Sequence, residues 1–216
     1  MERVGILGGT FNPPHIGHTA LARHARSELG LERVLLIPAN TPPNKLSERD
    51  DPGSEHRLHM CRLAIADEIG LEASALEIER GGVSYTVDTL QAIHDMRPDA
   101  ELTLILGADT ALTLPLWREP VRLLSLAGLA VAKRNDLDAQ EVLEALSPAK
   151  LGLQHASRVT FIRMSRIAAS SSMVRELVAA GRSVTELVGA AVADYIAAHG
   201  LYRAVGASAP AAGGAA

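Results

Sequence analysis

Two histidines stand three residues apart, behind a pair of glycines, near the start of this 216-residue chain. The stretch is GGTFNPPHIGH, residues 8–18, and it ends with His15 and His18. An apolar run at residues 3–7 precedes it and a helix-like run at residues 18–29 follows, which predicts a strand, a turn and a helix. Imidazole N–H groups beside the positive end of a helix dipole can donate hydrogen bonds to phosphate oxygens.

The same residues allow other interpretations. Gly8 and Gly9 permit a tight turn and a close approach to a ligand, but neither G-x-G-x-x-G nor G-x-x-x-x-G-K-[ST] is present. Either histidine could be an ordinary helix cap or surface residue. An H-x-x-H pair also suits zinc, although no third ligand follows at a convincing spacing and the only cysteine, Cys61, lies on a distant predicted helix. We therefore expect no metal held by protein ligands.

The length and composition of the chain limit the classes of protein to which it can belong. A chain that is 47% hydrophobic should be globular, and we expect one domain over residues 1–203 with a disordered low-complexity tail at 204–216. The net charge of −4 offers no bulk basic surface, so neither nucleic acid nor a membrane is an expected partner. A single cysteine suits a reducing compartment, and we expect a cytoplasmic protein.

Buried apolar runs alternate with helical patterns along the chain, which predicts an α/β fold with a parallel sheet covered on both faces. The expected strands are residues 3–7, 33–37, 75–79, 101–106, a segment within 126–134, and 158–163. The expected helices include residues 18–29, 55–69 and 84–96. The proline-rich loop at 38–54 is long, so we expect it to be mobile without ligand and to order when nucleotides bind.

Two separated motifs resemble those of a known superfamily. GGTFNPPHIGH is similar to the first signature of the nucleotidyltransferases that carry a (H/T)-x-G-H motif, and ASSSMVR, residues 169–175, resembles their second signature. Members of that superfamily adenylate or cytidylylate phosphorylated small molecules. The resemblance implies a doubly wound, Rossmann-like sheet, which we expect to be followed by a C-terminal helical segment.

Further segments resemble the bacterial nicotinate-nucleotide adenylyltransferases: IPANTPPNK (37–45), GGVSYTVDTL (81–90), ILGADT (105–110), LPLWREP (114–120) and AAHGLY (197–202). The resemblance implies that the 5′-phosphate of nicotinate mononucleotide attacks the α-phosphate of ATP, accompanied by Mg²⁺. Products would be nicotinate adenine dinucleotide and pyrophosphate. Such chemistry can work by positioning and by neutralising phosphate charge.

The resemblance also assigns residues to the site. Implied catalytic groups are His15, His18, Arg175 and Lys45. Implied ATP-binding residues are Gly8, Gly9, Thr10, Phe11, Gly107, Asp109, Ser170, Ser171 and Ser172. Implied nicotinate mononucleotide-binding residues are Asn40, Tyr85, Thr86 and Trp117.

Simpler roles remain open for several of these residues. The serines and Asp109 could act only as helix caps, Lys45 could be a solvated surface lysine, and Trp117 could be a core anchor. At the level of function, two alternatives also stand. The enzyme could adenylate another phosphorylated metabolite, such as phosphopantetheine or nicotinamide mononucleotide, or the chain could be a non-catalytic nucleotide-binding regulator. The oligomeric state is left open, with a homo-oligomer as one option.

Overall fold

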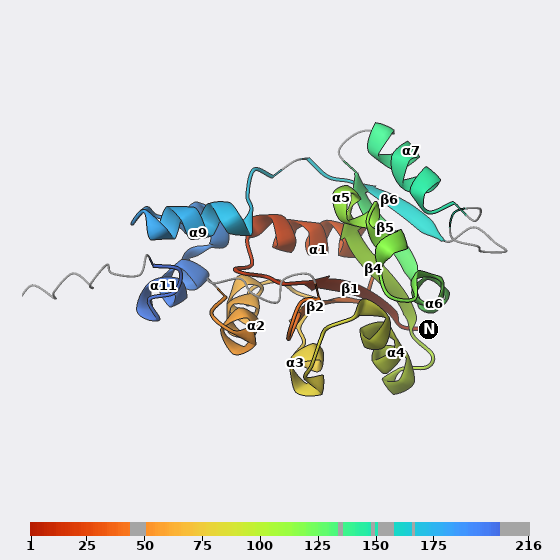
Figure 1. Ribbon diagram of the computed structural model, residues 1–216, viewed down its shortest axis with the longest axis horizontal. Helices are drawn as coiled ribbons and strands as arrows, with labels where there is room; N and C mark the ends of the chain where they lie inside the picture. Colours follow the sequence, from red (N-terminus) through yellow and green to blue (C-terminus); the bar gives the residue numbers. More distant parts are fainter. Residues whose placement is uncertain (44–50, 134–135, 148–149, 151–157, 166, 204–216) are drawn as a thin grey trace, which may run out of the picture.

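The sheet of this protein has six parallel strands in the order β3-β2-β1-β4-β5-β6 (Figure 1). It is seen in a computed structural model that describes residues 1–43, 51–133, 136–147, 150, 158–165 and 167–203. The strands are β1 (Arg3–Gly9), β2 (Arg33–Pro38), β3 (Leu71–Ala73), β4 (Glu101–Gly107), β5 (Gly128–Lys133) and β6 (Val159–Arg163). The chain therefore winds outward from β1 in one direction and from β4 in the other.

Helices connect the strands and extend beyond the last one. They are α1 (Ile16–Leu29), α2 (Ser54–Ala64), α3 (Leu76–Arg80), α4 (Thr86–Met96), α5 (Ala108–Ala111), the 3₁₀ turn η1 (Leu114–Leu116), α6 (Pro120–Leu126), α7 (Asp136–Ala145), α9 (Ser171–Ala179), α10 (Thr185–Val188) and α11 (Ala190–Ala198). This arrangement confirms the predicted doubly wound α/β fold and its C-terminal helical segment. The tail predicted at 204–216 and part of the loop predicted at 38–54 lie outside the described residues.

Alternate residues of the strands face opposite layers of helices, as the two-residue period of a strand requires. In β4, Leu104 belongs to the apolar cluster that contains Leu90 of α4 and Leu123 of α6. Its neighbour Ile105 belongs to the cluster on the other face, with Ala22 of α1. Both faces of the sheet are therefore buried, which explains why the strands read as nearly continuous apolar runs.

A third, smaller cluster joins α2 to the C-terminal helices. Met60 of α2 packs with Val174 of α9, Val188 of α10 and Val192 and Ile196 of α11, and all five side chains are almost completely buried. Figure 1 shows α9 and α11 together at one end of the molecule, beside α2. The C-terminal segment is thus fixed to the sheet domain through α2. None of the helices in the described ranges is long and apolar enough to cross a membrane.

One predicted element is wrong. Residues 75–79 were expected to form a strand, but residues 76–80 form α3 and the strand that pairs with β2 is β3. The alternation of Leu76, Glu77 and Ile78 imitates a half-buried strand. In the structure Glu77 is itself buried and accepts a hydrogen bond from the Thr89 hydroxyl at 2.6 Å, so tertiary contacts override the alternating pattern.

The packing around Gly5 leads to a prediction about stability. A Cβ added at this position in β1 would lie 2.8–2.9 Å from side-chain carbons of Leu31, Val34 and Ile105. Gly5→Ala should therefore lower the free energy of unfolding by about 1–3 kcal/mol. The control is Gly128→Ala, because a Cβ at that strand glycine would meet nothing closer than 3.6 Å. Urea unfolding of both variants measures the difference, and equal stabilities would contradict the packing argument.

Candidate active site

The turn between β1 and α1 begins directly after the two glycines, at Thr10. Gly8 and Gly9 are the last residues of β1, so the turn itself comprises residues 10–15. A Cβ on Gly9 would lie 3.2 Å from the buried Phe11 ring, whereas a Cβ on Gly8 would meet no atom within 4 Å. Phe11 has a φ of 53°, an uncommon value for a non-glycine residue, which turns the chain toward α1. The glycines therefore leave a strand end that a ligand can approach closely.

His15 and His18 form the start of α1 together. His15 is the N-cap: its Nδ1 accepts a hydrogen bond from the backbone N–H of Gly17 at 3.2 Å. In return, the N–H of His15 donates to Nδ1 of His18 at 3.1 Å, and the two rings stack with centroids 3.7 Å apart. Because both Nδ1 atoms accept, each neutral ring carries its proton on Nε2. The pair is therefore both a helix cap and two ordered Nε2–H donors.

Burial keeps these imidazoles neutral at physiological pH. Removal from water lowers the pKa of His15 from 6.5 to about 4. It lowers the pKa of His18 to about 3, with a further contribution from the neighbouring His15. The buried Phe11 ring packs against His18 at an interplanar angle of 69°, with centroids 4.9 Å apart, and contributes to the apolar surroundings. In the protein without ligand, the histidines thus act as neutral hydrogen-bond donors.

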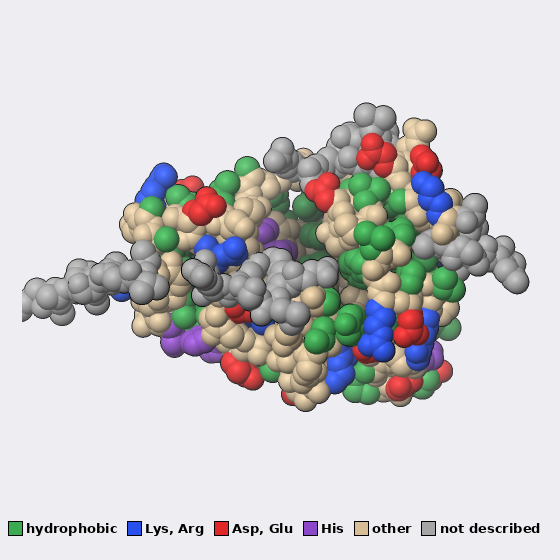
Figure 2. Space-filling model, viewed as in Figure 1, with side chains coloured by type: hydrophobic (Ala, Val, Ile, Leu, Met, Phe, Trp, Pro, Cys, Tyr) green, Lys and Arg blue, Asp and Glu red, His purple; other side chains and the backbone are tan. Residues whose placement is uncertain are grey.

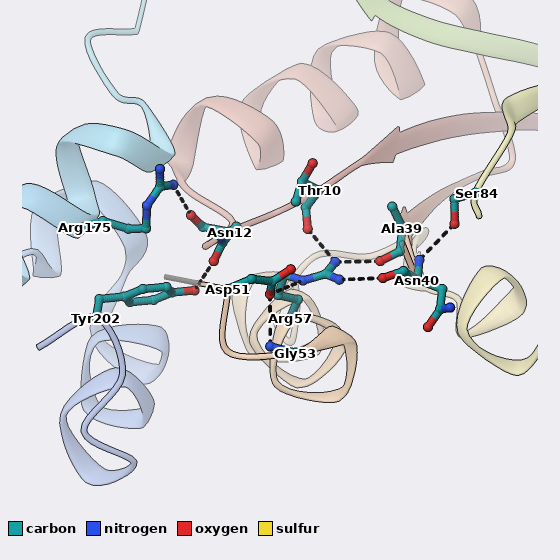
Figure 3. Close-up of polar contacts among 10 residues, drawn as sticks. All are labelled: Thr10, Asn12, Ala39, Asn40, Asp51, Gly53, Arg57, Ser84, Arg175 and Tyr202. Carbon is teal, nitrogen blue, oxygen red and sulfur yellow. Dashed lines mark hydrogen bonds and ion pairs between the residues drawn. The ribbon is translucent and has the colours of Figure 1, made fainter. Parts of the chain in front are cut away.

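The two motifs recognised in the sequence contact each other directly. Ser170 is the N-cap of α9 and accepts from the N–H of Met173 at 3.1 Å, as expected of a cap. The Ser171 hydroxyl donates to the carbonyl of Pro13 at 2.8 Å. Arg175 donates from Nη1 to the carbonyl of Asn12 at 2.7 Å (Figure 3). The second motif therefore holds the turn that follows β1.

A residue outside both motifs also holds this turn. The Tyr202 hydroxyl donates to Oδ1 of Asn12 at 2.8 Å (Figure 3). Burial, together with the negative charge of Asp51, raises the pKa of Tyr202, so the hydroxyl keeps its proton and remains a donor. Asn12 is almost completely buried. It accepts hydrogen bonds from both ends of the C-terminal segment, from Arg175 of α9 and from Tyr202.

Two cavities open at the carboxyl end of the sheet, next to β1 and β4. The first, of about 360 Å³, is lined by Gly8, Gly9, Thr10, Ala39, Pro42, Pro43, Glu77, Ser84, Tyr85, Thr86, Leu104, Leu106, Thr110, Thr113, Leu116, Trp117 and Arg118. The second, of about 460 Å³, is lined by His15, Gly17, His18, Leu21, Gly107, Ala108, Ala132, Lys133, Met164, Ser165, Ile167, Ala168, Ala169, Ser170 and Met173. Figure 2 shows histidine side chains inside the central hollow of the molecule.

The residues predicted for the two substrates are divided between these two cavities. Tyr85, Thr86 and Trp117, expected at the mononucleotide, line the first cavity, and His15 and His18, expected at ATP, line the second. Gly107 and Ser170 join the histidines, whereas Gly8, Gly9 and Thr10 line the first cavity instead. The remaining described candidates are not among the lining residues of either: Phe11, Asn40, Asp109, Ser171, Ser172 and Arg175. Lys45 lies outside the described residues.

The start of α4 presents backbone donors to the first cavity. Tyr85 is the N-cap and makes no side-chain capping bond, and Thr86 is the first helical residue. Within the part of the chain that the structure describes, no acceptor is bonded to the backbone N–H of Tyr85, Thr86 or Val87. Such groups at a helix start bind an anionic group favourably.

Side chains around that helix start complete the first cavity. Trp117 packs partly on the core and donates from Nε1 to the Thr113 hydroxyl at 3.0 Å, which orients its indole ring. The guanidinium carbon of Arg118 lies 4.8 Å from the centre of the Tyr85 ring, and the same group pairs with Asp88 at 3.3 Å. Arg118 thus brings a cation to the cavity, a contribution that sequence reasoning missed.

Two other buried polar residues near the site were also missed. Glu77 lines the first cavity, and Arg57, on the buried face of α2, lies behind its wall. A charged residue in the first turn of an amphipathic helix, directly before the apolar Leu58, was the available signal for Arg57. Cys61 on the same helix is buried and burial raises its thiol pKa, as expected of a small core residue. No group of three or more metal-ligating side chains occurs within the described ranges.

An open parallel sheet with cavities at the carboxyl ends of its central strands is the arrangement in which doubly wound α/β proteins bind their ligands. Residues 6–177 match the family described as Cytidylyltransferase-like. A probable nicotinate-nucleotide adenylyltransferase of Roseiflexus sp. strain RS-1 is 46% identical over 93% of this chain and 98% of its own. Another, from Thermomicrobium roseum, is 39% identical over 97% of this chain and 96% of its own. The chain belongs to this family of nicotinate-nucleotide adenylyltransferases.

Solved structures agree on the fold. The Plasmodium falciparum nicotinic acid mononucleotide adenylyltransferase complexed with NaAD superposes with a TM-score of 0.74, at 16% sequence identity. The superposition covers 94% of this chain and 98% of that one. At this low identity the likeness shows a shared fold and no more.

The neutral histidine pair predicts how stability depends on pH. Unfolding returns the pKa of His18 from about 3 toward 6.5, so the unfolded chain binds more protons between these values. Its contribution to stability is therefore complete above pH 6.5 and is lost as the pH falls toward 3. Between pH 7 and pH 5, the free energy of unfolding should fall by about 1–2 kcal/mol more in wild type than in His18→Gln.

The glutamine variant is a suitable comparison because Gln at this third helical position can still accept from the N-cap backbone. Urea unfolding of both proteins at a series of pH values measures the effect. The same pH dependence in both proteins would contradict the assignment of a neutral, buried His18.

Proposed function

We propose that this protein transfers the adenylyl group of ATP to the 5′-phosphate of nicotinate mononucleotide. A 5′-phosphate oxygen forms a bond to the α-phosphorus of ATP, the bond from that phosphorus to the β-phosphate bridging oxygen breaks, and pyrophosphate leaves. The product is nicotinate adenine dinucleotide. The observation that carries the proposal is the pair of cavities beside β1 and β4, one lined by the histidine pair and the other by Trp117 and the start of α4.

In this proposal the second cavity takes ATP. Nε2–H groups of His15 and His18 donate to phosphate oxygens, and the start of α1 adds its positive dipole end. His18 acts at the α-phosphate, where charge develops in the transition state. ATP enters as its Mg²⁺ complex, with the metal held mainly by phosphates and water. Asp109, at the start of α5, accepts from a ribose, and Lys45 approaches the phosphates.

The first cavity takes nicotinate mononucleotide. The indole ring of Trp117 stacks on the pyridine, and the free N–H groups at the start of α4 receive the carboxylate. Asn40 borders this site from the neighbouring loop: its side-chain nitrogen donates to the Gly82 carbonyl at 2.9 Å. Gly8, Gly9 and Thr10 form part of the wall of this cavity, and in this proposal the two phosphates meet beside them.

A pyrophosphate-release assay with the purified full-length protein tests the proposal. It is run with Mg²⁺-ATP and, in turn, nicotinate mononucleotide, nicotinamide mononucleotide and phosphopantetheine. We expect release with nicotinate mononucleotide, and product of the mass of nicotinate adenine dinucleotide. Release only with another acceptor would assign a different adenylyltransferase activity, and release with none would favour a nucleotide-binding regulator. The cytoplasmic location and a homo-oligomeric state stay predictions.

His18→Ala should lower kcat by about 100- to 1,000-fold, because it removes one preorganised donor to the transition state. Circular dichroism and thermal unfolding check that the variant is folded. The control is His24→Ala, since His24 lies on the exposed face of α1 and pairs with Glu28 of the same helix, at 3.9 Å. A folded His18→Ala protein with nearly normal kcat would contradict the role given to this histidine.

The value of kcat/KM should be about 100-fold or more higher for nicotinate mononucleotide, which carries a carboxylate, than for nicotinamide mononucleotide, which carries a carboxamide. Mismatched polar groups deliver discrimination in this range. The free N–H groups of α4 and the Arg118 cation favour an acceptor, and the carboxamide would leave its own N–H donors without partners. Steady-state kinetics with the acid and amide mononucleotides measure the ratio. Trp117→Phe is the control, and it should lower kcat/KM by about the same factor for both mononucleotides. Comparable kcat/KM values in wild type would contradict the donor argument.

A further inference from the structure

Arg57 is a completely buried guanidinium at the beginning of α2, with 0% of its surface exposed. It makes four hydrogen bonds (Figure 3). Nη1 donates to the carbonyls of Thr10 at 2.8 Å and Ala39 at 2.7 Å, and Nη2 donates to the carbonyl of Asn40 at 3.0 Å. Nε pairs with the carboxylate of Asp51 at 2.9 Å.

The carbonyls held by Arg57 come from two separate loops of the site. Thr10 is the first residue after β1 and Ala39 is the first after β2, and both line the first cavity. Thr10 also begins the turn that leads to His15. One guanidinium therefore fixes the spacing between the wall of the mononucleotide cavity and the turn that starts the histidine helix.

The contacts continue from these loops to α4. The N–H of Ala39 donates to the carbonyl of Gly9 at 2.9 Å, which pairs the two strand ends. The N–H of Asn40 donates to the Ser84 hydroxyl at 2.9 Å (Figure 3), and Ser84 directly precedes the N-cap of α4. The same guanidinium is thus connected, through Asn40 and the Ser84 hydroxyl, to the residue that precedes the N-cap of α4.

Burial of a charged group is poorly explained by stability alone. A buried ion pair contributes little on balance, and an apolar side chain of similar volume is often as stabilising. A planar guanidinium, in contrast, satisfies several carbonyls in one fixed geometry. Since the proposed adenylyl transfer depends on placing two phosphates in line, an error of about 1 Å in these loops can cost about 100-fold in rate.

From this arrangement we propose that Arg57 is a positioning residue for adenylyl transfer. It does not touch either substrate. It holds the Thr10 turn and the Ala39–Asn40 segment at the separation that brings the two phosphates together. This inference rests on the proposed function, and it extends that function to a residue behind the cavity wall.

The test compares Arg57→Lys and Arg57→Met with wild type. Methionine keeps the length and apolar stem but makes none of the four bonds, whereas a lysine ammonium reaches only some of the carbonyls. We expect kcat to fall by about 100-fold for Arg57→Met and by a smaller factor, about 10-fold, for Arg57→Lys. Affinity for ATP alone, measured by calorimetry, should change by less than about threefold, because the histidine cap remains intact.

The matched control is Arg33→Lys. Arg33 also pairs with carboxylates from other elements, Glu2 at 2.7 Å and Glu72 at 2.9 Å, but it lies at the opposite end of β2. Its kcat should stay within about twofold of wild type, since surface pairs of this kind contribute little. All rates are taken well below each variant's unfolding temperature and are expressed per folded molecule. A purely structural role would lower the unfolding temperature without lowering the rate per folded molecule.

Hydrogen exchange provides a readout that needs no substrate. In Arg57→Met the amides of Ala39 and Asn40 should exchange more than about tenfold faster than in wild type, while those of β4 keep their protection. Folded variants with unchanged kcat, or with unchanged exchange at these two amides, would overturn the proposal. Absence of any activity in wild type would instead refute the proposed function, and the exchange result would still decide whether Arg57 fixes the loops.

Discussion

β1 and β4 lie side by side at the centre of the sheet, but the chain leaves them in opposite directions, from β1 toward β2 and from β4 toward β5. Because crossovers between parallel strands are right-handed, the helices that follow these two strands cover opposite faces of the sheet. The loops therefore separate at the carboxyl edge and leave space between them. Both cavities open there, and every other feature of the site consists of groups placed around that separation.

In the space between these loops, the electrostatic attraction for a phosphate comes from oriented N–H groups and helix starts more than from charged side chains. The chain carries a net charge of −4, yet both proposed substrates are strongly anionic. The histidines are neutral without ligand because burial lowers their pKa values to about 4 and about 3. Fixed Nε2–H donors and the starts of α1 and α4 supply partial positive charge that needs no reorganisation when a phosphate arrives. A bound polyphosphate favours the protonated imidazole, so substrate itself would raise these pKa values.

Local sequence signals were sufficient to locate the central strands and to place the histidine pair at the start of a helix. Apolar runs located β1, β2 and β4, and the spacing of His15 and His18 indicated donors at a helix start. The family resemblance assigned Trp117 to the mononucleotide site, and Trp117 lines the first cavity. These features depend on residues close together in the chain, where strand period, helix period and capping rules apply directly.

Long-range contacts could not be found in the same way. The strand expected at 75–79 was wrong: residues 76–80 form α3, in which Glu77 is buried and bonded to Thr89, twelve residues further along. The contact between Tyr202 and Asn12 spans 190 residues. The carbonyls that surround Arg57 come from two loops whose meeting is a property of the folded sheet. A sequence pattern can place a charged residue on a buried helix face, but it does not name its partners.

The C-terminal helices give a physical reason for the second motif. Arg175, one of the implied catalytic groups, donates from Nη1 to the carbonyl of Asn12, and Ser171 donates to the carbonyl of Pro13. These bonds fix a turn that has no strand partners of its own. They are effective only if α9 is itself held, and the cluster of Met60, Val174 and Ile196 joins it to α2. The helix that presents Arg57 therefore also anchors the segment that presents Arg175, so the two guanidiniums hold the Thr10–Pro13 turn from a common support.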